Sequence, residues 1–528
     1  MKNTTHEISL PSENLDPETT SFDVAVPSGR SLAGNTLWNL FGNCFPVIVA
    51  VVCLPILKRG LGTERLGIIS LAWVVIGYFS LFDLGLSRAL TKLVAERIGQ
   101  NRQPEIPSLV WTSLFLMTGL GLVGSLLTFV LAPYLVERLL KVPASLSHEA
   151  LGSFYWLGAA VPVVVITAGL RGVLEALQHF RLATAIRIPI GIFTYLGPAA
   201  LLPFTHNLIP IIAVLVLGRT LACAAHFWAC FHVMPALRSS FGFHAPSARP
   251  LLLFGGWMTV SNVLGPLMVT FDRFLIGSVI SIAAVAYYSI PYEVVTKLWL
   301  ISTALVGVLF PVFSATSVVD RTRLAFLYES GVKYIFIVLL PVTLLMVIFA
   351  PEGLTVWMGS DFAHNSARVA RLLAVAVLVN SMAHVPLAHL QSVGRPDVTA
   401  KFHLLELPIY VVMLFFLAHR WGITGVAVAW LLRVIIDAFL LFWFSFRLLP
   451  ECRFIVTRLP LMIAAALAFN LIVISVSGLT VKIILAGAVF LVVVPALWAW
   501  VLTSADRAPL QFLLQRFKNW SGRQNLMR

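Results

Sequence analysis

Long apolar stretches separated by short polar segments recur along almost the whole chain. Fourteen of these stretches have the length of a membrane-spanning α-helix, which needs ~20 mainly apolar residues. The stretches are continuous and do not alternate between apolar and polar residues, which excludes an outer-membrane β-barrel. The pattern therefore predicts an all-α polytopic membrane protein with about 14 transmembrane helices. Their approximate limits are 34–57, 66–87, 109–136, 151–170, 186–204, 208–234, 251–271, 284–312, 334–350, 370–391, 403–418, 423–446, 459–477 and 483–503.

The two ends of the chain are more polar than the part between them. Residues 1–33 begin with a slightly acidic stretch and lack a basic segment followed by an apolar core, so they predict a disordered tail and no signal peptide. Near the other end, Leu510, Leu513, Leu514 and Phe517 recur at helical spacing. Residues 506–528 are therefore predicted to hold an amphipathic helix that lies on the inner leaflet.

The basic residues predict the orientation of the helices. Of the 37 Lys and Arg residues, 24 lie in the two tails and in every second loop, and 10 lie in the opposite set of loops. Cytoplasmic loops carry an excess of Lys and Arg. We therefore expect both termini in the cytoplasm, which agrees with an even number of spans.

The two halves of the chain resemble each other weakly. LWNLFGN at 37–43 aligns with PLLLFGG at 250–256, RIPIGIF at 187–193 with ELPIYVV at 406–412, and VLGRTL at 216–221 with WLLRVI at 430–435, at offsets of 213, 219 and 214 residues. Two copies of six helices would enter the membrane in the same sense and be related by a pseudo-two-fold axis along its normal. The matches predict an N-lobe over 34–250 (helices 1–6), a C-lobe over 251–450 (helices 7–12), and helices 13 and 14 within 451–505.

Composition narrows the class of protein further. Apolar residues make up 59% and charged residues 11% of the 528 residues, and the mean hydropathy is +0.92. These values exclude a soluble enzyme, a disordered scaffold and a nucleic-acid-binding domain, since soluble domains average about 25% charged residues. The net charge of +14 is interpreted as the topogenic excess of the cytoplasmic loops. The five cysteines form no CxxC pair and are interpreted as packing residues, so neither a metal site nor a cofactor is expected.

Several segments resemble the bacterial polysaccharide-transporter, or O-antigen flippase, family. They are LPILKRGLGTERLGIISLAWVVIGYFSLFDLGLSRALTKLVAERIG (54–99), LLLFGGWMTVSNVLGPLMVTFDRFLIGSVISIAAVAYYSIPYEVV (251–295), LRGVLEALQHFR (170–181), HLQSVGRPDVTAKFHLLELP (389–408) and WGITGVAVAWLLR (421–433). The resemblance covers roughly residues 32–500. The family belongs to a superfamily that also holds multidrug extrusion proteins and the lipid II flippase.

The resemblance implies a V-shaped pair of lobes around a central cavity lined mainly by spans 1, 2, 7 and 8. It implies a flippase that moves an undecaprenyl-pyrophosphate-linked oligosaccharide from the inner to the outer leaflet of the bacterial inner membrane by alternating access. Membrane lipids and glycan polymerase or assembly proteins are the further partners that we expect, and the chain is expected to be a monomer. Two members of the superfamily remain alternatives, a lipid II flippase and a multidrug or cation antiporter. Span 1 has no charge and offers only Asn35, Asn39 and Asn43, which argues against a lipid II flippase, where the first helices carry cavity arginines.

Charged residues inside the predicted spans are the first candidates for a binding site, because a charge at the bilayer centre costs about 2.5–3.5 kcal/mol on insertion scales. Glu293 and Lys297 lie four residues apart in span 8, so they share one helix face. They are expected either to neutralise each other or to offer a cation to the pyrophosphate and a carboxylate to a proton. We take them as cavity residues.

Other charged residues lie near the ends of spans. Asp83 lies near the inner end of span 2, with Arg88 five residues later, and Asp272 and Arg273 end span 7 at the outer face. The first pair is assigned to the cavity and the second to gating or headgroup contact. The alternative for all four is an interfacial side chain that reaches water.

A last group of polar residues has a weaker link to transport. Arg219 and Arg433 occupy matching places in spans 6 and 12, with Asp437 one turn after Arg433, while His403 and Glu406 lie near the start of span 11. The two arginines and Asp437 are assigned structural or lipid-phosphate contacts. Three asparagines are candidates for hydrogen bonds to sugars or between helices, namely Asn39, Asn43 and Asn262.

Neither the motifs nor the loops favour an enzyme. The sequence contains no Walker A loop, HExxH, GxSxG or Asp-rich cluster, and its loops are short. Without a nucleotide-binding domain, transport would draw its energy from an ion or voltage gradient or from consumption of the product outside. Moving two negative charges outward across 100 mV gains roughly 4.6 kcal/mol.

Overall fold

The structure is a computed structural model that describes residues 29–78, 83, 85–177, 179–238, 241–452 and 459–474, together with 476, 478–489, 491 and 495. For residues 29–44 and 253–269 it describes the backbone only. All regular secondary structure in the described ranges is helical, which confirms the all-α prediction. The first helix begins at Gly29, inside the tail predicted for 1–33. Residues 1–28 and the predicted amphipathic helix over 506–528 lie outside the described residues.

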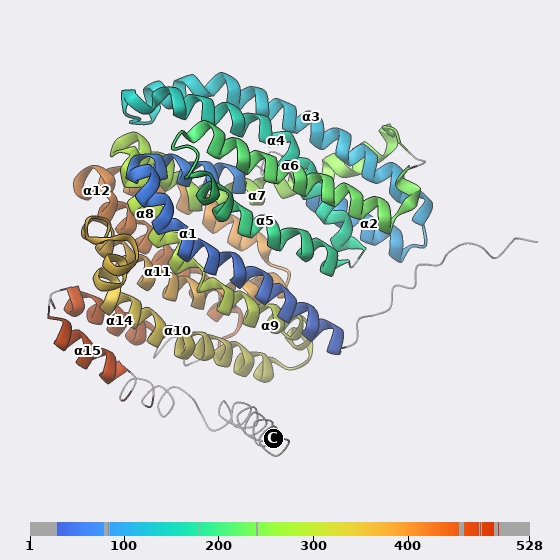
Figure 1. Ribbon diagram of the computed structural model, residues 1–528. Coiled ribbons are helices and arrows are strands. Elements are labelled where there is room, and N and C mark those ends of the chain that lie inside the picture. The colour runs from blue at the N-terminus through green and yellow to red at the C-terminus, as the bar shows by residue number, and fades with distance from the viewer. Residues whose placement is uncertain are drawn as a thin grey trace, which may run out of the picture.

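The helices follow one another with short connections (Figure 1). Their bounds are α1 Gly29–Tyr78, α2 Leu86–Gly99, α3 Ile106–Tyr134, α4 Ser147–Ala176, α5 Phe180–Leu201, α6 Leu208–Val233, α7 Ala245–Val279, α8 Ile282–Thr296, α9 Trp299–Val319, α10 Arg321–Met358, α11 Ser360–Ser392, α12 Pro396–Leu448, α14 Leu459–Ile474 and α15 Leu479–Ala488. A five-residue π-helix at Leu135–Leu139 follows α3.

Two of these helices extend over two predicted spans, although α1 covers only the first part of the span predicted for 66–87. α1 is bent at Gly62 and α12 at Gly422, and both glycines have a positive φ (80° and 58°) that other residues adopt only with strain. The bends lie in the short polar connections that the sequence predicted between spans 1 and 2 and between spans 11 and 12. The chain thus reverses at one glycine without an extended loop, so that polar backbone groups are kept out of the apolar layer.

The spans over 66–87 and 284–312 were predicted as continuous helices, and this was wrong. In the span predicted for 66–87, Gly85 has a positive φ of 76° and α2 begins only at Leu86; in the span predicted for 284–312, α8 ends at Thr296 and α9 begins at Trp299. A hydropathy average does not register one polar residue within a long apolar run. The charged residues at the two interruptions are Asp83 and Lys297, which are 214 residues apart. This spacing falls within the offsets of the predicted duplication.

Eight helices of the described residues are long and apolar enough to cross a membrane, and they overlap ten of the predicted spans. The span predicted for 334–350 is part of a longer helix, α10, which begins at Arg321. Apolar side chains cover much of the surface, as on α3, where Leu126 is 64% and Val130 66% exposed. A soluble protein rarely exposes such a continuous apolar surface, so these faces fit contact with lipid.

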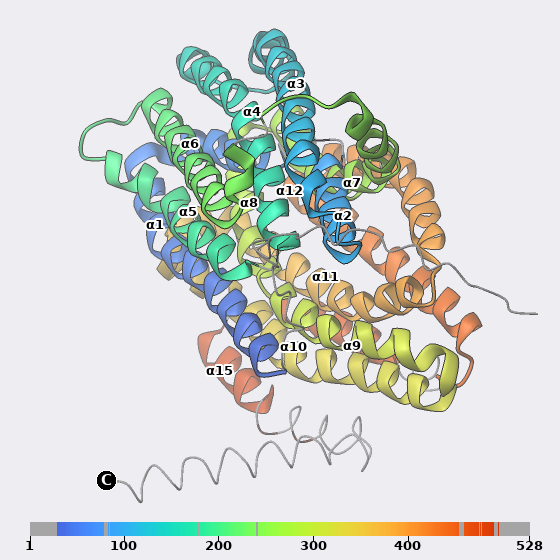
Figure 2. The ribbon, with the colours of Figure 1, turned by 90° about the vertical axis from the view of Figure 1, so that its right-hand side faces the viewer.

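The helices pack in two sets. α3, α4 and α6 lie together on one side of the molecule, and α10 and α15 lie on the opposite side, in both views (Figures 1 and 2). In the first set, α4 packs on α3 and α6, and α5 packs on α1; in the second, α11 packs on α9, α10 and α12. The sets meet where α1 packs on α8 and α2 on α7. The α1–α8 contact brings together the helices that carry most of the site described below.

A substitution at Gly67 can test the close approach of α1 to α8. A methyl group at Gly67 would stand only 2.0 Å from the carbonyl oxygen of Ile282, at the start of α8, and a backbone atom cannot rotate away. We expect Gly67→Ala to destabilise the protein by about 1–3 kcal/mol, measured as a lower thermal-unfolding temperature in detergent. Gly119→Ala is the control, because its methyl group would meet nothing within 4 Å. Equal stability of the two variants would contradict the packing of α1 on α8.

Candidate binding cavity

A cavity of about 550 Å³ opens where the two sets of helices meet. α1 and α8 contribute most of its wall, and single residues or pairs come from α5, α6, α7, α9 and α10. From α1 the wall is almost entirely apolar, with Ser70 and Trp73 as its polar members. The other helices supply the charged side chains, so the polarity of the cavity is carried by α6, α7 and α8.

The charged groups of the cavity have an excess of positive charge. Arg219, Arg273 and Lys297 line it together with one carboxylate, Glu293. Five large aromatic side chains complete the wall, namely Trp73, Tyr195, Tyr292, Trp299 and Trp357. Lysine and arginine side chains bind phosphate oxygens through charge-assisted hydrogen bonds, and the planar guanidinium group of arginine can form two at once. The flat faces of aromatic rings suit the apolar face of a sugar ring.

Glu293 and Lys297 form the ion pair that their spacing predicted. Lys297 Nζ lies 3.1 Å from Glu293 Oε2, and the two side chains are 43% and 41% exposed. Lys297 directly follows the last residue of α8, so its side chain leaves the helix at the interruption. A half-exposed pair is held weakly. Lys297 can therefore exchange its carboxylate partner for an anionic ligand in the cavity.

Asp272 and Arg273 are buried, and they do not end their helix as the sequence predicted. α7 continues to Val279, about two turns beyond the predicted end of span 7, and the side chains are 0% and 2% exposed. Their charged groups approach to 3.6 Å, and the Tyr288 hydroxyl donates a hydrogen bond to Asp272 Oδ2 at 2.7 Å. The guanidinium of Arg273 lies 4.3 Å from the centre of the Tyr292 ring. Because the two opposite charges compensate each other, the pair can be buried inside α7, and the helix continues past it.

The two arginines that matched by sequence have different positions. Arg219 lines the cavity from α6 and donates a hydrogen bond to Thr194 Oγ1 on α5 at 3.4 Å. Arg433, in α12, is buried to 8% exposure with its guanidinium 5.8 Å from the centre of the Tyr410 ring, and it does not line the cavity. The position of Arg433 therefore fits the structural role predicted for both arginines, whereas Arg219 lies at the cavity wall.

Asp83 and Arg88, predicted as cavity residues, do not line this cavity. Asp83 is buried and accepts hydrogen bonds from the backbone N–H groups of Gly85 (2.8 Å) and Ser87 (3.3 Å). Its carboxylate thus satisfies N–H groups at the start of α2, which have no partner within that helix. Arg88 is exposed on α2. The side chains of Asn39, Asn43 and Asn262 lie outside the described residues.

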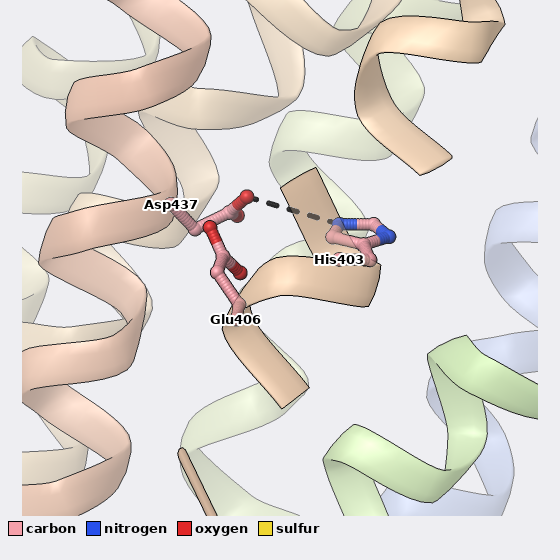
Figure 3. Close-up of side chains that lie close together, drawn as sticks. All are labelled: His403, Glu406 and Asp437. Carbon is pink, nitrogen blue, oxygen red and sulfur yellow. Dashed lines mark ion pairs between the residues drawn. The ribbon is translucent and has the colours of Figure 1, made fainter. Parts of the chain in front are cut away.

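A second polar cluster lies apart from the cavity, in α12. His403 and Glu406 come from the part of α12 before the Gly422 bend and Asp437 from the part after it (Figure 3). His403 Nε2 and Asp437 Oδ1 are 3.7 Å apart. The bend at Gly422 is what brings these residues together, because it lays the two parts of α12 side by side.

The comparison with family models places the chain in a known family. The model described as polysaccharide biosynthesis protein matches residues 32–317, which is more than half of the chain. The chain belongs to the polysaccharide biosynthesis protein family. This confirms the resemblance to polysaccharide transporters and O-antigen flippases that the sequence segments indicated.

Two bacterial relatives of this polysaccharide biosynthesis protein match along most of its length. A Shigella flexneri protein assigned the role of O-antigen transporter is 29% identical over 420 residues, which cover 79% of this chain and 98% of the relative. The lipopolysaccharide biosynthesis protein WzxC of Escherichia coli K12 is 20% identical over 413 residues, which cover 76% of this chain and 78% of the relative.

Solved structures of transporters share the fold. A multidrug resistance MATE family transporter of the MOP superfamily, in its inward-facing conformation, superposes with a TM-score of 0.65 at 16% identity and covers 79% of this chain and 95% of its own. The lipid II flippase MurJ, in an inward closed conformation, superposes with a TM-score of 0.60 at 12% identity and covers 86% of this chain and 98% of its own. The polysaccharide biosynthesis protein therefore has a MATE-like fold.

Sequence reasoning missed two features of the cavity in this family member. It did not place Arg219 at the cavity, because matching positions in two repeats suggest equal roles. It also did not single out the aromatic residues, although Trp73, Tyr292 and Trp299 lie in spans that the family resemblance assigned to the cavity. Aromatic residues are frequent in membrane proteins, so the sequence carried no signal that separated these from the rest.

The Asp272–Arg273 pair gives a stability prediction. Arg273→Met keeps much of the volume of the side chain and leaves Asp272 buried without its cation, and breaking a buried ion pair costs about 3–5 kcal/mol. We expect a clearly lower thermal-unfolding temperature, measured by circular dichroism in detergent, and partial recovery in Asp272→Asn/Arg273→Met.

Lys297→Met is the control for this measurement. It breaks a half-exposed pair, which is worth less than about 1 kcal/mol. Equal destabilisation by Arg273→Met and Lys297→Met would show that burial does not distinguish the two pairs.

Proposed function

We propose that the chain is a flippase that moves an undecaprenyl-pyrophosphate-linked oligosaccharide, the repeat unit of an O-antigen or related polysaccharide, from the inner to the outer leaflet of the bacterial inner membrane. The observation that carries the proposal is the cavity between the two sets of helices, with three cations, one carboxylate and five aromatic side chains. Membership of the polysaccharide biosynthesis protein family supports the substrate class. Both termini would lie in the cytoplasm, and the chain would act as a monomer.

The chemistry of the cavity matches the two ends of such a substrate. Arg219 and Lys297 would attract the pyrophosphate, whose oxygens accept several charge-assisted hydrogen bonds at once, while Arg273 stays paired with Asp272 at the cavity wall. The aromatic faces would contact the sugars. A volume of about 550 Å³ lies within the ~300–1,000 Å³ range of small-molecule sites. The cavity would thus hold the headgroup and the first sugars, while the lipid chain would remain in the membrane.

The same cavity disfavours the two alternatives. A carrier of cationic drugs would be expected to present an excess of carboxylates, and the formal charges of this cavity sum to a positive value. For a lipid II flippase, arginines would be expected on the first helices, and the α1 residues that line the cavity carry no charge.

Alternating access would require the two sets of helices to move as lobes about the cavity. Contacts between the sets at the predicted outer end support a closed outer side. Lys58 Nζ donates a hydrogen bond to the carbonyl oxygen of Met358 at 2.7 Å, and Trp357 Nε1 donates to that of Val51. The backbone N–H of Lys141 donates to the carbonyl oxygen of Gly277 at 2.8 Å. Release on the outside would require these contacts to break.

The substrate can be identified by deleting the gene in a host without a second flippase and measuring undecaprenyl-pyrophosphate lipids by mass spectrometry. We expect one complete oligosaccharide to accumulate on its carrier and to return to normal when the intact gene is restored. Lys297→Gln and Arg219→Gln should restore transport at least about tenfold less well, since a hydrogen bond to a charged group contributes about 1.5–3 kcal/mol.

Lys401→Gln is the matched control, because this lysine is 72% exposed and pairs with Asp397 outside the cavity. An unchanged lipid pool after deletion would favour drug or ion antiport. Equal rescue by the cavity variants and the control would remove the cavity cations from the transport path.

The outer closure can be tested by labelling. Thr296 lines the cavity, and Thr296→Cys in a cysteine-free chain would react with an impermeant maleimide added outside only when the outer end opens. Lys58→Met removes one hydrogen bond of the closure, worth about 1 kcal/mol, so we expect labelling to rise about fivefold. Arg59→Met changes the exposed neighbouring residue and should leave the rate unchanged. The proposed closure of the outer end would be contradicted if Arg59→Met also raised the labelling rate, or if Lys58→Met did not raise it.

A further inference from the structure

The polar cluster in α12 lies outside the cavity and takes no part in the proposed binding of the substrate. Its members are His403, Glu406 and Asp437, whose side chains converge from the two parts of α12 (Figure 3). One donor atom from each of the three lies within 4.8 Å of those from the other two. The arrangement therefore brings one imidazole nitrogen and two carboxylates to a single point.

The two carboxylates are buried with few partners. Glu406 is 4% and Asp437 5% exposed. Among the residues that the structure describes, neither oxygen of Glu406 has a hydrogen-bond partner, and Oδ1 of Asp437 also has none. Buried carboxylates are normally paired, hydrogen-bonded or bound to a metal. Both oxygens of Glu406 therefore have free capacity to bind a cation.

The neighbouring cation does not fill this position. Arg433 lies one turn before Asp437 on α12, but its guanidinium lies near the Tyr410 ring, and no ion pair joins it to Glu406 or Asp437 within the described residues. On α7, Asp272 and Arg273 pair with each other. If all three carboxyl groups of this region are ionised and the histidine is neutral, the two guanidiniums leave one negative charge uncompensated, and a bound cation would favour that ionised state.

We propose that His403, Glu406 and Asp437 bind a divalent transition-metal ion, for which Zn²⁺ is the best match. One imidazole nitrogen with carboxylate oxygens is a donor set typical of zinc, whereas Mg²⁺ and Ca²⁺ prefer oxygen alone. Three protein ligands leave a fourth position for water. If this water is bound as hydroxide, the ion and its ligand together add one positive charge, which balances the negative charge of the region.

The geometry needs a small closing movement. Donors on one tetrahedral zinc ion lie about 3.4 Å apart when the bonds are about 2.1 Å, against the separations of up to 4.8 Å seen between the three donor atoms. The side chain of His403 is 28% exposed, so it can rotate and also offers the ion a route from the surface. A bound ion would fasten the part of α12 before Gly422 to the part after it.

The experiment uses the full-length chain, purified in detergent and treated with a chelator. After dialysis against Zn²⁺, metal content is measured by mass spectrometry and affinity by calorimetry. We expect about one Zn²⁺ per chain, an affinity at least tenfold lower in Glu406→Gln and in His403→Asn, and a Zn²⁺-dependent rise in unfolding temperature that both variants lose. Glu406→Gln keeps the size of the side chain, and His403→Asn changes a partly exposed residue, so both should fold.

His419→Asn is the matched control. This exposed histidine lies on the same helix, and its ring is hydrogen-bonded to the carbonyl oxygen of Phe415; its loss should leave Zn²⁺ binding unchanged. Failure of the intact chain to bind Zn²⁺ would overturn the proposal. So would binding that persists in both cluster variants or disappears in the control. The readouts do not involve transport, so the result is independent of the proposed flippase activity.

Discussion

A charge inside the apolar layer of a membrane protein needs a partner or water, and the positions of the polar residues in this chain follow from that requirement. Lys482 on α15 lies 2.6 Å from Glu352 on α10. Arg371 on α11 donates a hydrogen bond to the carbonyl oxygen of Val347 on α10. Each partner comes from a neighbouring helix. The charges that burial would otherwise penalise therefore fasten pairs of helices together.

Glu149 is a charged residue whose hydrogen bonds connect more than two helices. Two nitrogens of Arg65 on α1 donate to it at 3.0 and 2.7 Å, and the backbone N–H of Leu208 at the start of α6 donates at 3.1 Å. One carboxylate on α4 thus joins three helices at the same end of the molecule. In contrast, Glu293 and Lys297 form an ion pair with each other and remain about 40% exposed at the cavity. A site for a charged ligand follows from this difference: compensated charges build the scaffold, and the weakly held ones stay available for binding.

The backbone is under the same constraint. Where a helix stops inside the apolar layer, its free N–H groups need acceptors, and at the start of α2 the carboxylate of Asp83 accepts two of them. The corresponding interruption in the second half occurs between α8 and α9, at Lys297. Both interruptions adjoin helices that join the two sets, α2 on α7 and α8 on α1. Interrupted helices at this junction would let the two sets move relative to each other with little bending of the remaining helices.

The sequence by itself determined the class of fold, because lipid requires continuous apolar helices and the chain shows them as uninterrupted runs. It also determined the Glu293–Lys297 pair and the breaks near Gly62 and Gly422, since each depends only on local spacing or on a short polar connection. The tertiary structure alone decided which distant residues meet. Arg219 and Arg433 match by sequence, yet one lines the cavity and the other is buried beside Tyr410. The reason is that a residue's surroundings depend on how helices far apart in the chain pack, and hydropathy along the chain does not record that packing.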